Sequence, residues 1–161
     1  AAPPGPVAAL DLPALRQATY PLAGVESRET VTLRDGRFVD EAARLRADLA
    51  DSLVCWGDLD GDGRDEAVTL LSYDTGGTGL FRELVVFGES VGHTLPLGAC
   101  LLGDRVKVHS VAVQDSQVVV GMVTHDEDDP LCCPTLAVVR AYRLRGGDLV
   151  RSDGRRPGAA P

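Results

Sequence analysis

Residues 53–73 read LVCWGDLDGDGRDEAVTLLSY, and this stretch indicates both the fold and the candidate site. The segments 53–56 and 67–73 are short, apolar and rich in residues that favour β-strands. Between them lies a loop of carboxylates and glycines. We therefore expect the acidic loop to join two β-strands rather than two helices, with Trp56 packed in the core.

Short strand-like segments occur along most of the remaining chain. They are residues 30–33, 37–39, 81–87, 97–102, 106–113, 118–124, 136–144 and 149–151. Asp35-Gly36 separates the first two and predicts a tight hairpin. Residues 41–50 alternate apolar and charged side chains, which favours a strand, although the same residues also suit a helix.

A short helix is expected near the N-terminus. Asp11 can cap a helix through Leu12, Leu15 and Ala18, which Pro21 would end. The predicted fold is all-β: an antiparallel meander that forms a sandwich or a partly open barrel, with this short N-terminal helix.

The length of 161 residues predicts a single domain. Residues 1–10 are rich in Ala, Pro and Gly and are expected to form a flexible tether. Residues 11–151 are expected to form the β domain, and the polar tail 152–161 is expected to be disordered.

The net charge of −8 and the lack of a basic stripe argue against binding to nucleic acid or to an anionic membrane. No apolar run is long enough to cross a bilayer. The sequence begins at Ala1 with a run rich in Ala and Pro, as a processed exported protein would, and a lipid anchor is possible. We expect an exported protein of the periplasm, outer envelope or cell surface, where calcium is abundant.

Carboxylates alternate along the acidic loop. Asp58, Asp60 and Asp62 would supply side-chain oxygens at the first, third and fifth positions, and Glu66 would supply one at the ninth. The backbone carbonyl of Arg64 would be a further ligand at the seventh position, with its side chain free to pair with Asp65. Such converging oxygens favour a hard cation, and we expect calcium.

The loop resembles the short calcium loop of FG-GAP and integrin-propeller blades, where Asp-x-Asp/Asn-x-Asp-Gly-x-x-Asp lies between strands. The resemblance covers about a dozen residues and implies the same ligand set, with Glu66 in place of the family's shorter Asp. It does not imply a propeller, for which the chain is too short. An EF-hand would need Glu at the twelfth position, which holds Thr69.

A wider resemblance spans roughly residues 11–150. The segments Ala18–Pro21, Gly57–Gly63, Leu102–Val106 and Asp129–Thr135 follow one another as in an uncharacterised bacterial domain of exported proteins and lipoproteins. This resemblance implies a location in the cell envelope and no established activity.

Four cysteines, Cys55, Cys100, Cys132 and Cys133, are candidates for disulfides and allow three full pairings. A bond between adjacent cysteines would be strained, because their Cα atoms lie about 3.8 Å apart. In an extended segment the two side chains would also point to opposite faces. Bridges that join Cys55 and Cys100, or that link either of them to Cys132 or Cys133, are therefore expected instead.

A second metal site is an alternative. Met122, His125, Cys132 and Cys133 are soft or borderline ligands that would hold copper if the chain between them curled back. Such a site would suit a redox-protective envelope protein, for example a superoxide-dismutase-like subunit. Oxidised cysteines would not be ligands, which disfavours this alternative.

The chain lacks the Gly-x-Ser-x-Gly and His-Glu-x-x-His motifs of common hydrolases. These absences favour a protein that is not an enzyme, although Asp74, Glu83 and Asp104 would suit glycoside hydrolysis if they met in space. The predicted function is a calcium-binding structural or interaction module of the cell envelope, whose partner is another envelope or surface-layer protein.

Overall fold

The computed structural model describes residues 10–25 and 29–153. Its elements, in chain order, are α1 (Leu12–Leu15), β1 (Thr19–Pro21), β2 (Thr30–Thr32), β3 (Arg37–Asp40), β4 (Leu45–Leu49), the 3₁₀ turn η1 (Asp51–Leu53), β5 (Cys55–Gly57), β6 (Glu66–Asp74), β7 (Phe81–Ser90), β8 (His93–Asp104), β9 (Lys107–Gln114), β10 (Gln117–Thr124), β11 (Leu136–Arg145) and β12 (Asp148–Arg151). The predicted all-β class with one short helix is confirmed. Residues 1–9 of the predicted tether and residues 154–161 of the predicted tail lie outside the described residues.

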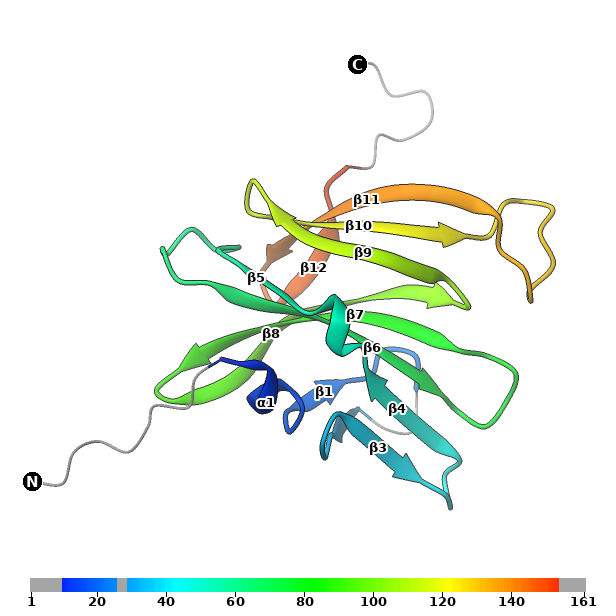
Figure 1. Cartoon of the computed structure of the whole chain (residues 1–161), viewed down its shortest axis with the longest axis horizontal. Coiled ribbons are helices and arrows are strands. Elements are labelled where there is room, and N and C mark those ends of the chain that lie inside the picture. The colour runs from blue at the N-terminus through cyan, green and yellow to red at the C-terminus, as the bar shows by residue number, and fades with distance from the viewer. Residues whose placement is uncertain (1–9, 26–28, 154–161) are drawn as a thin grey trace, which may run out of the picture.

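Three antiparallel sheets make up the fold (Figure 1). The central sheet has the order β3-β4-β6-β7-β8, and β5 pairs with the start of β6 on the same edge that β4 uses further along. A four-stranded sheet, in the order β12-β11-β10-β9, covers one face of the central sheet. The small sheet β1-β2 lies with α1 on the opposite side. The arrangement is an open sandwich and not a closed barrel.

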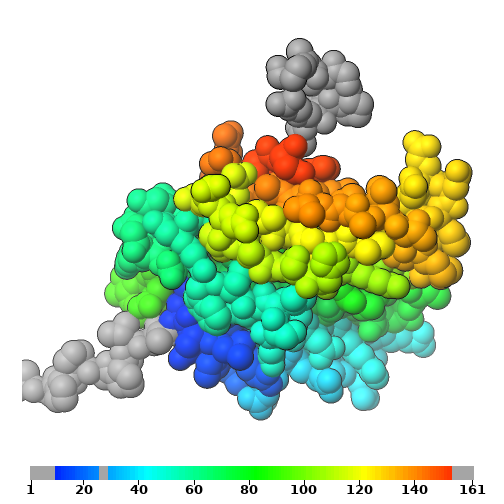
Figure 2. Space-filling view, turned by 45° about the horizontal axis from the view of Figure 1, so that its top comes forward, coloured from blue at the N-terminus to red at the C-terminus, as the bar shows by residue number. Residues whose placement is uncertain are grey.

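The central sheet is buried on both faces, so the molecule has two hydrophobic cores. In β6, Leu71 and Tyr73 face the N-terminal elements, whereas Val68 and Leu70 face the four-stranded sheet. The strand therefore reads as an almost continuous apolar run instead of alternating apolar and polar residues. Figure 2 shows the outer layers in yellow to orange and in blue, with teal and green segments between them.

The N-terminal helix is shorter than predicted. Asp11 caps it as expected, because its Oδ1 accepts a 3.0 Å hydrogen bond from the backbone N–H of Ala14. The helix ends at Leu15 after a single turn, and Thr19–Pro21 forms β1. Pro21 thus belongs to a strand that pairs with β2, and the prediction that it ends the helix is wrong.

The turn at Asp35-Gly36 is confirmed, but the hairpin around it is not. Asp35 and Gly36 both have positive φ (51° and 80°), and Arg34 and Arg37 exchange backbone hydrogen bonds across them. Beyond this bridge the strands separate, because β2 pairs with β1 and β3 pairs with β4. The turn therefore connects two sheets.

The segment 41–50, which suits a strand or a helix, contains a strand. This strand, β4, is the outcome that the sequence favoured, and buried and exposed residues alternate along its whole length.

Leu10, placed in the tether by prediction, packs against the N-terminal core, and its backbone carbonyl accepts a 2.9 Å hydrogen bond from Trp56 Nε1. Trp56 itself is 42% exposed, so its assignment to the core is wrong. No helix in the described part of the chain is long and apolar enough to span a membrane.

Candidate metal centre

The acidic loop joins β5 to β6, which confirms that it lies between two strands. Gly57 and Glu66 face each other as the last paired residues of these strands, and residues 58–65 leave the sheet between them. Leu59 is buried and packs into the core between the two larger sheets. One apolar side chain inside the loop therefore fixes its base to the body of the protein.

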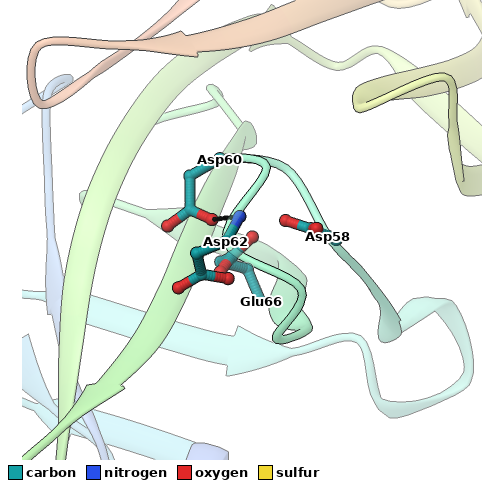
Figure 3. A group of neighbouring side chains, drawn as sticks. All are labelled: Asp58, Asp60, Asp62 and Glu66. Carbon is teal, nitrogen blue, oxygen red and sulfur yellow. Dashed lines mark hydrogen bonds between the residues drawn. The ribbon is translucent and has the colours of Figure 1, made fainter.

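Four carboxylates gather in this loop (Figure 3). Asp58, Asp60, Asp62 and Glu66 each offer one oxygen, and these oxygens lie within 4.8 Å of one another. Asp60 and Asp62 are exposed, Asp58 is half-buried and Glu66 is only 3% exposed. Among the described residues, this is the group of His, Cys, Asp and Glu side chains that could hold a metal ion.

Backbone hydrogen bonds hold these carboxylates in place. Asp58 accepts from the N–H groups of Gly61 and Gly63, at 2.8 and 2.9 Å. Asp60 accepts from the N–H of Asp62 at 3.0 Å, which is the contact drawn in Figure 3. Each aspartate thus shapes the loop by accepting from residues further along it, as in Asx turns, and keeps lone pairs for a cation.

The two loop glycines are required for their backbone conformation and not for space. Gly61 and Gly63 have φ values of 81° and 84°, which disfavour residues with a Cβ. A Cβ at either position would meet no atom within 4 Å. These turns bring the carboxylates at every second residue, Asp58, Asp60 and Asp62, to the same side of the loop.

The carboxylates of the loop shift one another's pKa values. The N–H of Gly63 holds the pKa of Asp58 below its usual value, and the N–H of Arg64 does the same for the pKa of Asp62. Burial raises the pKa of Glu66, and the charges of Asp60 and Asp62 add to this effect. The pKa of Asp60 is raised, since desolvation and the charge of Asp62 beside it outweigh the backbone hydrogen bond from Asp62. Asp58 and Asp62 therefore favour the charged form while their neighbours Asp60 and Glu66 resist it, and a bound cation would relieve the repulsion between them.

Arg64 contacts a different carboxylate from the one predicted. Its Nε lies 3.5 Å from Asp62 Oδ2, and its backbone N–H donates to Asp62 Oδ1 at 2.7 Å. The guanidinium thus pairs with a carboxylate of the cluster as a local counter-charge, and the expectation that it pairs with Asp65 is wrong. The backbone carbonyl of Arg64 stays a predicted ligand.

A hollow borders the cluster on the side of the β7–β8 hairpin. It is lined by Asp60, Asp62 and Glu66 together with Glu89 and Ser90 of β7. Sequence reasoning missed these last two residues. Their position follows from the register of β7 beside β6, where Phe87 pairs with Ala67, so the signal is the pairing of the strands and not a local motif.

The disulfide predictions are wrong. Cys132 and Cys133 are bonded to each other, and Cys55 and Cys100 are free thiols. Cys132 and Cys133 lie in a turn closed by the hydrogen bond from Cys133 N to Pro130 O, so the assumption of an extended segment fails. Cys55 on β5 and Cys100 on β8 belong to strands separated by β6 and β7, which keeps their sulfurs apart.

The alternative copper ligands His125, Cys132 and Cys133 do not form a metal-binding group among the described residues. Met122 is fully buried in the core between the larger sheets. The Nε2 atom of His125 lies 2.9 Å from the carbonyl oxygen of Leu131. Because Cys132 and Cys133 form a disulfide, they offer no thiolate to a metal.

No protein-family model, curated protein or solved structure matches this chain.

Proposed function

We propose that this chain is an exported calcium-binding β domain that serves as a structural or interaction module of the cell envelope. The observation that carries the proposal is the convergence of Asp58, Asp60, Asp62 and Glu66 within 4.8 Å. All four donors are hard oxygens, which calcium prefers and which suit copper or zinc poorly. The Arg64 carbonyl and water would complete a coordination number of six to eight.

The position of the site supports a structural role. The loop connects β5 and β6, and Glu66 belongs to a strand that is buried on both faces of the sandwich. A bound ion would fix the exposed loop to this rigid strand. A ligand present at a hundred times its dissociation constant stabilises the folded state by about 2.7 kcal/mol.

Terbium luminescence tests the metal site directly. Terbium replaces calcium at oxygen sites, and the only tryptophan, Trp56, lies two residues before Asp58 and can sensitise its emission. We expect emission that saturates at one terbium per chain and that calcium reverses. Asp60→Asn should weaken binding by about tenfold or more, because it removes one charge while keeping an oxygen to accept from Asp62 N–H.

Asp128→Asn is the matched control, because it removes the same charge from the other acidic run, in the exposed loop between β10 and β11. Its affinity should equal that of the natural protein. If Asp60→Asn bound terbium with the same affinity as the natural protein, the proposed site would be rejected. Export is tested separately by fractionating the source cells, where the protein should appear in the envelope or the medium and not in the cytosol.

A further inference from the structure

Glu83 is a buried carboxylate that the metal centre does not use. It lies on β7, paired with Leu71 of β6 and Leu101 of β8, and its side chain is 0% exposed. It faces the N-terminal layer, as do Val85 and Phe87 two and four residues further along the same strand. A charged residue in such a position needs a partner, because burial of an unpaired carboxylate is costly.

Only one of its two oxygens has such partners. Glu83 Oε1 accepts from Tyr73 Oη at 2.9 Å and from the backbone N–H of Ala23 at 3.0 Å. Tyr73 Oη in turn accepts from Gly24 N–H at 2.9 Å, so this oxygen ties the turn after β1 to the central sheet. Oε2 is buried and has no hydrogen-bond partner among the described residues. A purely structural role accounts for Oε1 and leaves Oε2 unexplained.

Glu83 forms part of the wall of an open hollow of about 440 Å³. This volume lies in the range of small-molecule sites. The N-terminal segment, β8 and the start of β12 supply the other lining residues: Pro21, Leu22, Ala23, Val25, Glu29, Pro96, Gly98, Ala99, Gly147 and Asp148. Among the lining residues that the structure describes, three are acidic, none is basic, and most of the others are apolar.

This composition defines the chemistry of a ligand. Three carboxylates with no basic residue among the described lining favour a positively charged group, and the charge of Glu83 is weakly screened in its apolar surroundings. A bare metal ion does not fit, because the converging metal-ligand group in the described residues is the acidic loop alone. The apolar walls require a ligand with an aliphatic part beside its charge.

We propose that this hollow binds an alkylammonium group, with the ammonium toward Glu83 and the aliphatic chain along Pro21, Leu22 and Pro96. Glu29 and Asp148 are exposed, and they add negative charge at the rim. The same chemistry is carried by a free polyamine and by the lysine side chain of a partner protein. The site is separate from the metal centre and does not depend on it.

Titration of the calcium-saturated protein with n-butylammonium, followed by amide NMR shifts, tests this proposal. We expect saturable shifts at Ala23, Gly98 and Asp148, and much weaker ones with butan-1-ol, which has the same chain without the charge. Glu83→Gln keeps an oxygen for Tyr73 and Ala23 but places an amide at the site. It should lower the affinity for n-butylammonium by at least about tenfold.

Glu127→Gln is the control, because it makes the same substitution in the exposed loop between β10 and β11 and should leave the affinity unchanged. If Glu83→Gln does not fold, Asp148→Asn at the rim should still weaken binding, by about threefold. No saturable shift in the natural protein, or equal affinity in the natural protein and the Glu83 or Asp148 variant, would overturn the proposal. 1,4-Diaminobutane represents a free polyamine, and lysine blocked at its backbone amino and carboxyl groups represents a lysine side chain of a partner protein. Whichever of the two binds more tightly identifies the preferred source, and tighter binding of either supports the site.

Discussion

The Oε2 atom of Glu66 accepts a 2.6 Å hydrogen bond from the backbone N–H of Leu59. Both residues are buried, and the bond closes the acidic loop at its base. The same carboxylate faces Asp58, Asp60 and Asp62. Glu66 therefore has two roles: it anchors the loop to β6, and it is the one buried residue of the cluster.

These two roles are separable by substitution. Glu66→Gln keeps an oxygen for Leu59 N–H but loses the charge, so the affinity for calcium should fall by about 10- to 100-fold. Its metal-free stability should not fall, because burial disfavours the charged form. Glu66→Ala should in addition destabilise the metal-free protein by about 1–3 kcal/mol, since Leu59 N–H loses its partner. Calcium titration and urea unfolding in chelator measure both effects, and natural affinity in Glu66→Gln would refute the ligand role.

Gly61 within the loop and Gly57 just before it should respond differently to alanine. Gly61→Ala meets no atom within 4 Å but retains a φ of 81°, so it should cost about 1 kcal/mol of unfolding free energy. A Cβ at Gly57 would lie 2.5 Å from Val113 Cγ1, and Gly57→Ala should cost more, about 1–3 kcal/mol, through overpacking. Chemical denaturation in chelator compares the two. A larger loss for Gly61→Ala would contradict this packing.

The bond between Cys132 and Cys133 should contribute little to stability. Disulfides stabilise mainly by restricting the unfolded chain, and the effect grows with the length of the loop that they close. These cysteines are adjacent, so replacing both with serine should change the unfolding free energy by less than about 1 kcal/mol. Mass spectrometry after alkylation of the unfolded, unreduced protein should find labels on Cys55 and Cys100 alone. A label on Cys132 or Cys133 would reject the pairing.

Glu83 should make the stability fall as the pH rises. Burial raises the pKa of this carboxyl, so the folded state binds its proton more tightly than the unfolded state does. Stability due to this proton is present below the unfolded pKa, near 4.5, and is lost as the pH rises through the folded pKa. Where the folded and unfolded pKa values differ by one, the loss amounts to about 1.4 kcal/mol. Glu83→Gln should remove this dependence, and urea unfolding at pH 4 to 8 in the two proteins measures it. Identical pH profiles would contradict it.

Local patterns made much of the fold and the site predictable. The alternation of Asp58, Asp60 and Asp62, with glycines between them, depends on neighbouring residues alone and predicts a turned loop with its carboxylates on one side. The strand character of 67–73 and the capping by Asp11 are equally local. These predictions hold because nearby atoms determine them.

The errors concern contacts between distant parts of the chain. The sequence around Asp35-Gly36 specifies a turn, but the partners of β2 and β3 depend on the order of strands in two sheets. The separation of Cys55 from Cys100 likewise depends on β6 and β7 lying between their strands. Glu83 looks like an ordinary polar position of a strand until the N-terminal layer covers that face.

The central claim is that the native protein holds one calcium ion in its acidic loop. Elemental analysis of protein purified without chelator, by inductively coupled plasma mass spectrometry, tests it most directly. The predicted result is about one calcium per chain and no stoichiometric transition metal, with the calcium lost in Asp60→Asn. Stoichiometric copper, iron or manganese, or no metal at all in protein kept in millimolar calcium, would contradict it.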